Sequence, residues 1–279
     1  MSDLIAVVGA TGKQGGAVVN ALLERGAPVR ALTRDAGSDR ALALAERGVE
    51  VVVADVDDPV ATRAALDDVS ALSLMTTFAG ADGPRGETRR GITLVEAARD
   101  AGVPFVVQSS VGGAERETGI PHFESKRRVE EALEASGVAH AFVRPVFFME
   151  NLAYQLPASG ADKAVVRMPM PGTVPLQLVA VVDIGRVVAA LVTDPEGAAG
   201  TAVEIAGDEL TFEQIVAQIS AATGVPTRFA ELPVDALDDD RGSMFRWFST
   251  LPAYQADFAA TKALDPQVLS FADWLVAGR

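Results

Sequence analysis

Up to Pro145 the chain alternates between short, continuously apolar runs and longer amphipathic stretches. The apolar runs are rich in β-branched residues and predict strands at Leu4–Val8, Pro28–Thr33, Val49–Val53, Ala71–Thr76, Phe105–Gln108 and Ala139–Val143. The stretches between them predict helices at Ala17–Arg25, Asp39–Arg47, Pro59–Leu66, Arg85–Ala101 and His122–Ala135. Strands without a polar face need cover on both sides, so the pattern predicts an α/β fold with a doubly wound parallel sheet.

Beyond Pro145 the regular alternation ends, and prolines interrupt short, irregular apolar pieces. Helices are expected at Asp183–Val192 and, after the capping residue Thr211, at Phe212–Ala222. A strand at Thr201–Ile205 is expected to rejoin the main sheet, and the chain beyond the second helix is expected to be mostly helical. We therefore expect a main domain of residues 1–150, joined by 183–206. Residues 151–182 and 207–279 are expected to form a smaller lobe over the strand ends.

Composition and charge exclude several kinds of site. The 279 residues include no cysteine and two histidines, which excludes disulfides, thiolate nucleophiles and multi-histidine zinc sites, and no metal is expected. A net charge of −14 disfavours direct binding of nucleic acid. The basic cluster at Lys126–Arg128 precedes Glu130 and Glu131, which predicts a salt-bridged helix face. The acidic run Asp238–Asp240 is expected to be a solvated loop.

The same sequence argues against targeting to a membrane. The apolar stretch Leu176–Val192 is broken by Asp183 and Arg186, so no membrane span is expected. Because a strand is predicted from Leu4, we also expect no signal peptide and a cytoplasmic protein.

Three glycines at three-residue steps follow the first predicted strand. Gly9 permits a sharp turn, Gly12 lets the backbone approach a pyrophosphate, and Gly15 lets the next helix pack close to the strand. The N–H groups at the start of that helix would face the anion. The spacing differs from the G-x-G-x-x-G of ordinary dehydrogenases, and a glycine-rich turn without a ligand is the alternative. Its place at the first strand of an alternating chain favours dinucleotide binding.

The end of the second predicted strand bears on the choice between NADP and NAD. An arginine here accommodates the 2′-phosphate of NADP, whereas an acidic residue holds the ribose 2′-hydroxyl of NAD. The sequence places Thr33 and Arg34 directly after the strand, followed by Asp35, which looks like a helix N-cap. Lys13 in the glycine turn adds a second positive charge. This arrangement favours NADP, the alternative being a solvated Arg34 with Asp35 as the ribose acid.

Polar residues also follow the next three predicted strands. Asp55, with Val56 beside it, could accept a hydrogen bond from an adenine amino group, or could only precede a helix. Thr76–Phe78 lie where the backbone would pass the middle of the cofactor. Ser109 and Ser110 lie where this fold places contacts to the nicotinamide or the substrate, although two small hydroxyls also suit a turn.

His122 and Lys126 are four residues apart on a predicted helix and so share a face. Short-chain dehydrogenases use a tyrosine and a lysine at this spacing, where the lysine grips the nicotinamide ribose. A histidine in the place of the tyrosine could still donate a proton, because it titrates near neutral pH. The alternative is a histidine at a helix start and a surface lysine.

The segment Phe147–Asn151 follows the sixth predicted strand at the junction of the two parts. Its aromatic residues and the amide of Asn151 suit a pocket wall over the nicotinamide, although a stripe of Phe and Met is more often core. The polar Asn151 beside this stripe favours the pocket.

Together these motifs resemble the NmrA-like family, atypical members of the short-chain dehydrogenase/reductase superfamily. The resemblance rests on residues 8–16, 33–34, 55–58, 122–126 and 144–151, and on a similar tail from Leu264 to Leu275. It spans nearly the whole chain and implies a Rossmann domain, a small α/β lobe and binding of NADP(H), with NADPH preferred over NADH. The wider superfamily's tyrosine is missing, which argues against ordinary carbonyl reduction.

The motifs and the resemblance together define the candidate site. The candidate cofactor-binding residues are Gly9, Ala10, Thr11, Gly12, Lys13, Gln14, Gly15, Thr33, Arg34, Asp55, Val56, Thr76, Thr77, Phe78, Arg89, Lys126, Phe148, Met149, Glu150 and Asn151, of which Ala10, Thr11, Gln14 and Arg89 come from the resemblance alone. The candidate substrate-binding residues are Ser109, Phe147 and Asn151, and the candidate catalytic residues are Lys126 and His122.

Two functions follow from this candidate site. The first is an NADPH-dependent oxidoreductase acting on a small, flat substrate such as a quinone. The alternative is a non-catalytic sensor of the NADPH/NADP ratio that regulates a protein partner. Either protein is expected to be a monomer or a homodimer without direct contact to nucleic acid or membrane.

Overall fold

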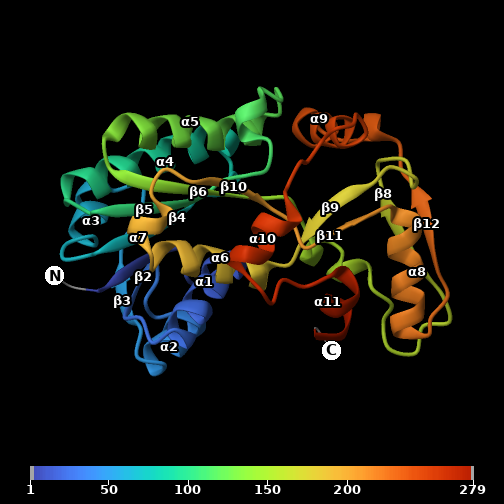
Figure 1. The fold of residues 1–279 in the computed structure, drawn as a ribbon, viewed down its shortest axis with the longest axis horizontal. Helices are drawn as coiled ribbons and strands as arrows, with labels where there is room; N and C mark the ends of the chain where they lie inside the picture. The colour runs from blue at the N-terminus through green and yellow to red at the C-terminus, as the bar shows by residue number, and fades with distance from the viewer. Residues whose placement is uncertain (1–2, 278–279) are drawn as a thin grey trace.

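The computed structural model describes residues 3–277 and is built on a seven-stranded parallel sheet (Figure 1). The strand order is β10-β6-β5-β4-β1-β2-β3. The strands are β1 (Ile5–Val8), β2 (Val29–Thr33), β3 (Glu50–Val53), β4 (Ala71–Met75), β5 (Phe105–Ser109), β6 (Ala139–Pro145) and β10 (Ala202–Ile205). Successive strands run outward from β1 in one direction and from β4 in the other. A crevice therefore opens between β1 and β4 at the carboxyl ends of the strands.

Helices cover both faces of this sheet (Figure 1). One face carries α1 (Lys13–Glu24), α2 (Asp39–Glu46) and α6 (Val181–Val192), and the other carries α3 (Pro59–Ala64), α4 (Gly83–Asp100) and α5 (Pro121–Ser136). Alternate residues of β1 enter different cores. Ile5 and Val7 belong to the core that contains α1 and α6, whereas Ala6 and Val8 belong to the core that contains α4. Burial on both faces explains why the strands are continuously apolar in sequence.

The smaller lobe lies beyond the carboxyl ends of the main sheet (Figure 1). One of its sheets contains β7 (Phe147–Phe148), β9 (Leu176–Val179) and β11 (Asp208–Leu210), and the other contains β8 (Ala164–Met168) and β12 (Thr227–Glu231). Its helices are α8 (Phe212–Thr223), α9 (Asp239–Phe248), α10 (Phe258–Leu264) and α11 (Phe271–Ala277), while α7 (Pro195–Ala198) precedes β10. Phe212, Phe248 and Phe271 belong to the same core cluster as β1 and α1, so the two parts share one core.

The α/β fold with a doubly wound parallel sheet is confirmed, and the predicted strand at Thr201–Ile205 corresponds to β10, which pairs with β6. Two local predictions near the glycine turn were wrong. Helix α1 begins at Lys13 rather than Ala17. Glycine has a low helix propensity, but the close packing of the first turn of α1 on the preceding loop favours a helix there. Asp35 is not an N-cap, because α2 is capped by Ser38 and the Asp35 carboxylate accepts the Gly37 N–H at 2.8 Å.

Two predictions in the smaller lobe also need correction. The segment Thr227–Glu231 forms a strand beside β8, where mostly helical chain was expected. The acidic run at Asp238–Asp240 is not a solvated loop: Asp238 caps α9, and Asp240 contacts the main domain. The pairing of this strand with β8 and the contact of Asp240 with His122 both depend on segments far away in the sequence.

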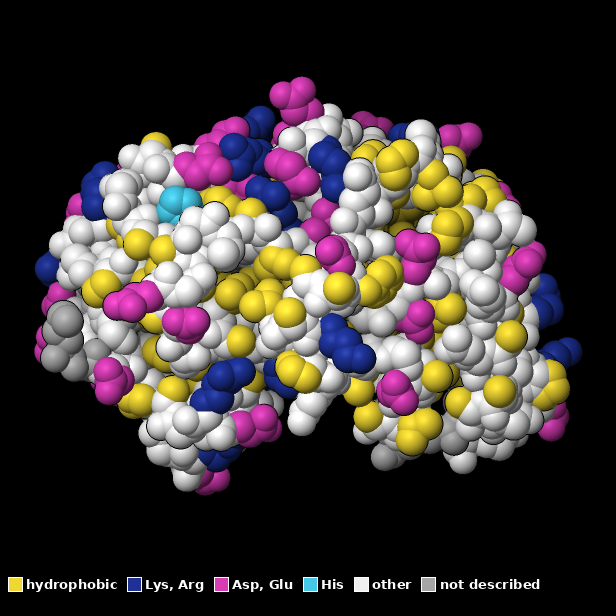
Figure 2. All heavy atoms as spheres, viewed as in Figure 1, with side chains coloured by type: hydrophobic (Ala, Val, Ile, Leu, Met, Phe, Trp, Pro, Cys, Tyr) yellow, Lys and Arg dark blue, Asp and Glu magenta, His cyan; other side chains and the backbone are white. Residues whose placement is uncertain are grey.

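The surface carries both signs of charge. On the face drawn in Figure 2, basic side chains are scattered among acidic ones, and apolar side chains gather in the smaller lobe beside α9. Within residues 3–277, no helix has the length and apolar character needed to cross a membrane.

Candidate functional site

A cavity of about 790 Å³ opens at the carboxyl ends of β1, β2, β3 and β4. Its volume lies in the range of small-molecule sites. The candidate residues on its wall are Gly9, Thr11, Gly12, Lys13, Gln14, Thr33, Arg34, Asp55, Val56, Thr76 and Thr77. The wall also contains residues that the sequence analysis did not select, among them Asp57, Met75, Asp82 and Arg90.

The glycine turn is shaped to hold phosphate groups above α1. Gly9 has a φ of +70°, which favours glycine, and its carbonyl accepts the Gly12 N–H at 2.8 Å. A Cβ atom at Gly15 would overlap the Gly9 carbonyl, so the close start of α1 requires glycine there. The N-cap residue Gly12 supplies no side-chain acceptor to the first-turn N–H groups. These residues therefore fit the pyrophosphate of a dinucleotide.

Two cations beside this turn are free to bind an anion. The Lys13 and Arg34 side chains are exposed, and neither makes a hydrogen bond or ion pair with any residue in the described range 3–277. The neighbouring polar groups are engaged within their own loop. The Thr33 hydroxyl bonds the backbone of Asp35 in both directions at 3.2 Å, and the Asp35 carboxylate holds Gly37. Arg34 is thus the charged group of this segment best placed to meet a 2′-phosphate.

A cluster of charges borders the cavity at the start of α4. Arg89 donates to Asp57 at 3.0 Å and to Asp82 at 2.8 Å, and Arg90 donates to Asp82 at 2.9 Å. Hydrogen bonds from both arginines hold the pKa of the Asp82 carboxyl below its usual range. Arg89 is 58% exposed and lies outside the cavity wall, whereas Arg90 lines it. The structure thus adds Arg90 to the cavity wall, while Arg89, which the resemblance implied, bonds two residues of that wall and stays a predicted cofactor contact.

Lys126 lies directly behind the cavity wall. Its Nζ atom donates to the Thr76 carbonyl at 3.1 Å and pairs with the Glu87 carboxylate at 3.0 Å. Glu87 is completely buried and also accepts the hydroxyls of Thr76 and Ser125. Burial alone would raise the pKa of Glu87, but the charge of Lys126 and these hydrogen bonds hold it below its usual value. Glu87 therefore stays ionised and fixes the Lys126 ammonium beside Thr76.

His122 lies at the start of α5, and its contacts come from both parts of the molecule. Its ring centroid is 4.6 Å from that of Phe78, which follows Thr77 of the cavity wall. Its Nδ1 atom is 2.7 Å from Oδ2 of Asp240, and its backbone N–H donates to Oδ1 of the same residue at 3.0 Å. A carboxylate only accepts, so this network assigns the proton to Nδ1. His122 was predicted from the sequence, whereas Asp240 was not.

Ser109 is the last residue of β5. Its hydroxyl accepts the Gln14 side-chain amide at 2.6 Å, and Ser109 is almost completely buried. This contact joins the end of β5 to the first turn of α1. The hydroxyl of the adjacent Ser110 is buried and has no hydrogen-bond partner in the described chain.

The candidate wall at Phe147–Asn151 is only partly available to ligands. Met149 is fully buried, and Phe147 packs edge-on against Phe248. The Glu150 carboxylate accepts the Val181 N–H at 3.0 Å and the indole N–H of Trp274 at 3.0 Å. These side chains join the two parts of the fold, and the role of the segment in ligand binding stays a prediction. Phe148 is half-buried and Asn151 is exposed.

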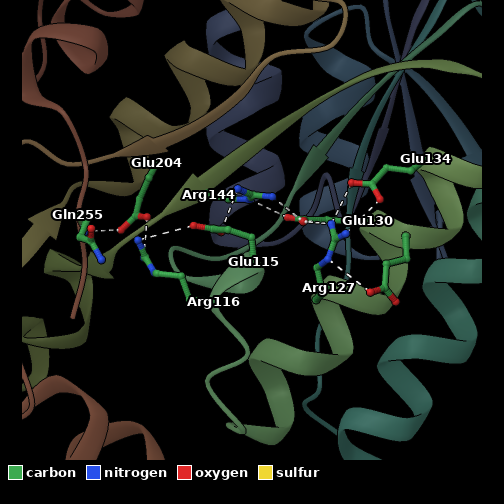
Figure 3. A network of polar contacts seen from close by, with 9 residues as sticks. Glu115, Arg116, Arg127, Glu130, Glu134, Arg144, Glu204 and Gln255 are labelled. Atoms are coloured by element: carbon green, nitrogen blue, oxygen red, sulfur yellow. Dashed lines mark hydrogen bonds and ion pairs between the residues drawn. The ribbon is translucent and has the colours of Figure 1, made fainter. Parts of the chain in front are cut away.

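A chain of ion pairs holds the neighbouring loop after β5 (Figure 3). Arg144 pairs with Glu115 at 2.9 Å and with Glu130 at 2.8 Å, and Arg116 pairs with Glu204 at 2.7 Å. Further along α5 the chain continues through Arg127, Glu131 and Glu134, as expected for a salt-bridged helix face. Glu115 and Arg116 belong to η1 (Ala114–Arg116), so this network anchors the segment that follows Ser110.

Comparison with known proteins places these observations in a family. The model of the NmrA-like family matches residues 1–272. The NAD(P)H azoreductase of Xenophilus azovorans is 30% identical over 233 residues, covering 83% of this chain and 78% of that protein. The (4-alkanoyl-5-oxo-2,5-dihydrofuran-3-yl)methyl phosphate reductase of Streptomyces griseus is 34% identical over 235 residues, covering 84% and 78%.

Solved structures share the fold at lower identity. The quinone oxidoreductase QOR2 of Escherichia coli in complex with NADPH has a TM-score of 0.83 and 22% identity, covering 98% of this chain and 99% of that chain. The negative transcriptional regulator NmrA in complex with NADP has a TM-score of 0.82 and 17% identity, covering 98% and 94%. The relatives include NAD(P)H-dependent reductases, and the family model covers nearly the whole sequence. The chain therefore belongs to the NmrA-like family.

Proposed function

We propose that this protein is an NADPH-dependent reductase of a small, flat, electron-poor substrate such as a quinone. The observation that carries the proposal is the continuity of the site. The glycine turn, which fits a pyrophosphate, shares one cavity wall with Thr76 and Thr77. Lys126 lies directly behind this wall at the Thr76 carbonyl, and His122 packs on Phe78, the residue after Thr77. The azoreductase and quinone oxidoreductase among its relatives support a reductase of conjugated substrates.

The preference for NADPH over NADH rests on Arg34 and Lys13. Both are cations without a partner in the described residues, and both line the cavity. The binding of a dianionic 2′-phosphate gives them charge-assisted hydrogen bonds that a 2′-hydroxyl does not offer. Asp35 is the competing acid, but one oxygen of its carboxylate is engaged by Gly37.

The proposed roles of Lys126 and His122 follow from their contacts. When bound, the nicotinamide cofactor supplies a hydride to the substrate. Lys126, held by Glu87 and Thr76, has donor capacity left for a ribose hydroxyl. His122 is the candidate proton donor, and Phe78 beside it provides an aromatic face for a planar ring.

The test is oxidation of NADPH against a panel of quinones, azo dyes and conjugated enones, with cofactor affinity measured by nicotinamide fluorescence. We expect turnover clearly above the enzyme-free blank. In Arg34→Ala we expect NADPH binding to weaken by about ten- to a hundredfold, since a charged hydrogen bond contributes roughly 1.5–3 kcal/mol, with NADH binding little changed. Arg25→Ala, at the far end of α1, is the matched control and should bind both cofactors normally. Equal NADPH affinity in both variants would overturn the assignment of Arg34.

A regulatory sensor is the second candidate, supported by the shared fold of the NmrA regulator and by the missing tyrosine. It requires tight binding of NADPH or NADP without turnover of any substrate in the panel. The same experiment therefore separates the two functions.

A further inference from the structure

We infer that Asp240 of α9 is the positioning residue of His122, so that the proton-donating pair is assembled from both parts of the molecule. This inference rests on the proposed reductase function. Asp240 is 118 residues away from His122 in the sequence, and its carboxylate contacts both the ring and the backbone of that histidine.

The two contacts have different consequences. Oδ1 of Asp240 accepts the His122 N–H and so caps the first turn of α5. The N-cap residue of this helix, Ile120, has no polar side chain that could do so. The contact of Oδ2 with Nδ1 does more than hold a helix end. It fixes the plane of the ring and requires a proton on Nδ1, because an ionised carboxylate has no proton to donate.

The opposite ring nitrogen is left free for chemistry. No described residue is hydrogen-bonded to Nε2 of His122, and this atom is not among the unpartnered polar atoms that are closed to solvent. Phe78 and Phe123 pack on the imidazole and restrict its rotation further. With Nδ1–H held by Asp240, protonation of the ring occurs at Nε2, and the same atom can release the proton.

The proton step then balances with reduction of a quinone. A hydride from a bound NADPH would carry two electrons and leave the quinone as a hydroquinone monoanion, which needs one proton. The Nε2–H bond breaks, its electron pair stays on Nε2, and the proton forms an O–H bond on the substrate. The ring returns to the neutral Nδ1–H form, and the Asp240 carboxylate stabilises the positive charge that the ring carries beforehand.

Asp240→Asn separates the two contacts. The amide oxygen can still accept the His122 backbone N–H, but the amide NH₂ then faces Nδ1 and favours the tautomer with the proton on Nε2. Such a ring cannot take up a proton at Nε2. The matched control is Asp238→Asn, which changes the charge of the same helix turn at the residue that caps α9 and accepts the Arg241 N–H at 2.8 Å.

The first measurement is ¹⁵N NMR of histidine-labelled protein, which does not require turnover. The chain has two histidines, and His140 is an internal reference because its Nδ1 lies 2.8 Å from the Val138 carbonyl. We expect the Nδ1–H tautomer for neutral His122 in the wild type and in Asp238→Asn, and the Nε2–H tautomer in Asp240→Asn. An Nε2–H tautomer in the wild type would overturn the inference without any variant.

The second measurement is kcat with the quinone that the panel shows to be turned over fastest. General acid catalysis contributes about 10²–10⁴-fold, so we expect kcat of Asp240→Asn to fall about a hundredfold with unchanged NADPH affinity. Asp240→Asn should cause no further loss in a His122→Asn background, because the carboxylate acts through the ring. A further loss there, or a kcat within about twofold of the wild type, would overturn the inference. An inactive wild type would instead refute the proposed function, and the inference with it.

Discussion

Asp183 offers a quantitative test of the junction between α6 and the C-terminal segment. Its carboxyl is completely buried, accepts the Leu269 N–H at 3.1 Å and lies near Arg186 and the buried Asp265. Burial raises the pKa of Asp183 to about 7, and Asp265 adds to this effect against the opposing influence of Leu269 and Arg186. The folded protein thus keeps a proton there that the unfolded chain releases near pH 3.8.

This difference in proton binding sets the direction of the pH dependence. Between about pH 4 and pH 7 the folded state binds more protons at Asp183 than the unfolded state, so the stability falls as the pH rises. Above pH 7 both states are ionised and the loss is complete. The difference between these two pKa values of Asp183 corresponds to roughly 4 kcal/mol of stability. We take about 2 kcal/mol as the expected effect, because relaxation reduces such penalties in real proteins.

Asp183→Asn removes the charge and keeps an oxygen for Leu269. We expect the variant to be about 2 kcal/mol more stable than the wild type at pH 8 and nearly equal to it at pH 4.5, measured by urea unfolding at both pH values. Asp208→Asn is the matched control, since Asp208 also accepts a backbone N–H of the C-terminal segment, from Phe271, but is only half-buried. The same gain at both pH values, or a loss of stability at pH 8, would refute the reasoning.

Two further predictions concern the cavity. Lys126→Met leaves the buried Glu87 carboxylate without its cation and should lower the free energy of unfolding by roughly 3 kcal/mol. The double variant Lys126→Met/Glu87→Gln should recover most of this loss in urea unfolding. Equal stability of the single and double variants would contradict the pairing of Lys126 with Glu87. Gly15→Ala places a methyl group against the Gly9 carbonyl and should weaken NADPH binding more than tenfold, measured by fluorescence titration. Gly16→Ala is the control and should bind NADPH normally, because its Cβ atom would lie 3.4 Å from the nearest atom.

The part of the cavity formed by the glycine turn and Arg34 was predictable because it is local in sequence. The glycine turn and Arg34 belong to consecutive elements, and each residue type has a chemical reason to occur at the end of its strand. The start of α1 was misplaced for a related reason. Glycines lower helix propensity, and only the packing of Gly15 on Gly9 shows why the helix begins among them.

The surroundings of Lys126 and His122 were less predictable, because their contacts join segments that are distant in sequence. Glu87 did leave a signal in the sequence: it lies on the same face of α4 as Gly91, Leu94 and Ala98, all of them buried. A carboxylate on an apolar face indicates a buried partner, although the sequence does not say that the partner is Lys126. Asp240 left no such signal, since three consecutive acids at a helix start are ordinary capping residues.

The residues proposed to bind NADPH and the residue that holds His122 come from different parts of the molecule. The groups proposed to hold NADPH belong to the main domain, whereas His122 is held from the smaller lobe by Asp240. Glu150 ties the same lobe to the main domain through Val181 and Trp274. Because the two sets of contacts are separate, substitutions in α9 can alter the surroundings of His122 while the glycine turn and Arg34 stay intact. If the proposed function holds, a variant of α9 should therefore lose turnover without losing affinity for NADPH, because the residues proposed to bind the cofactor lie on other elements.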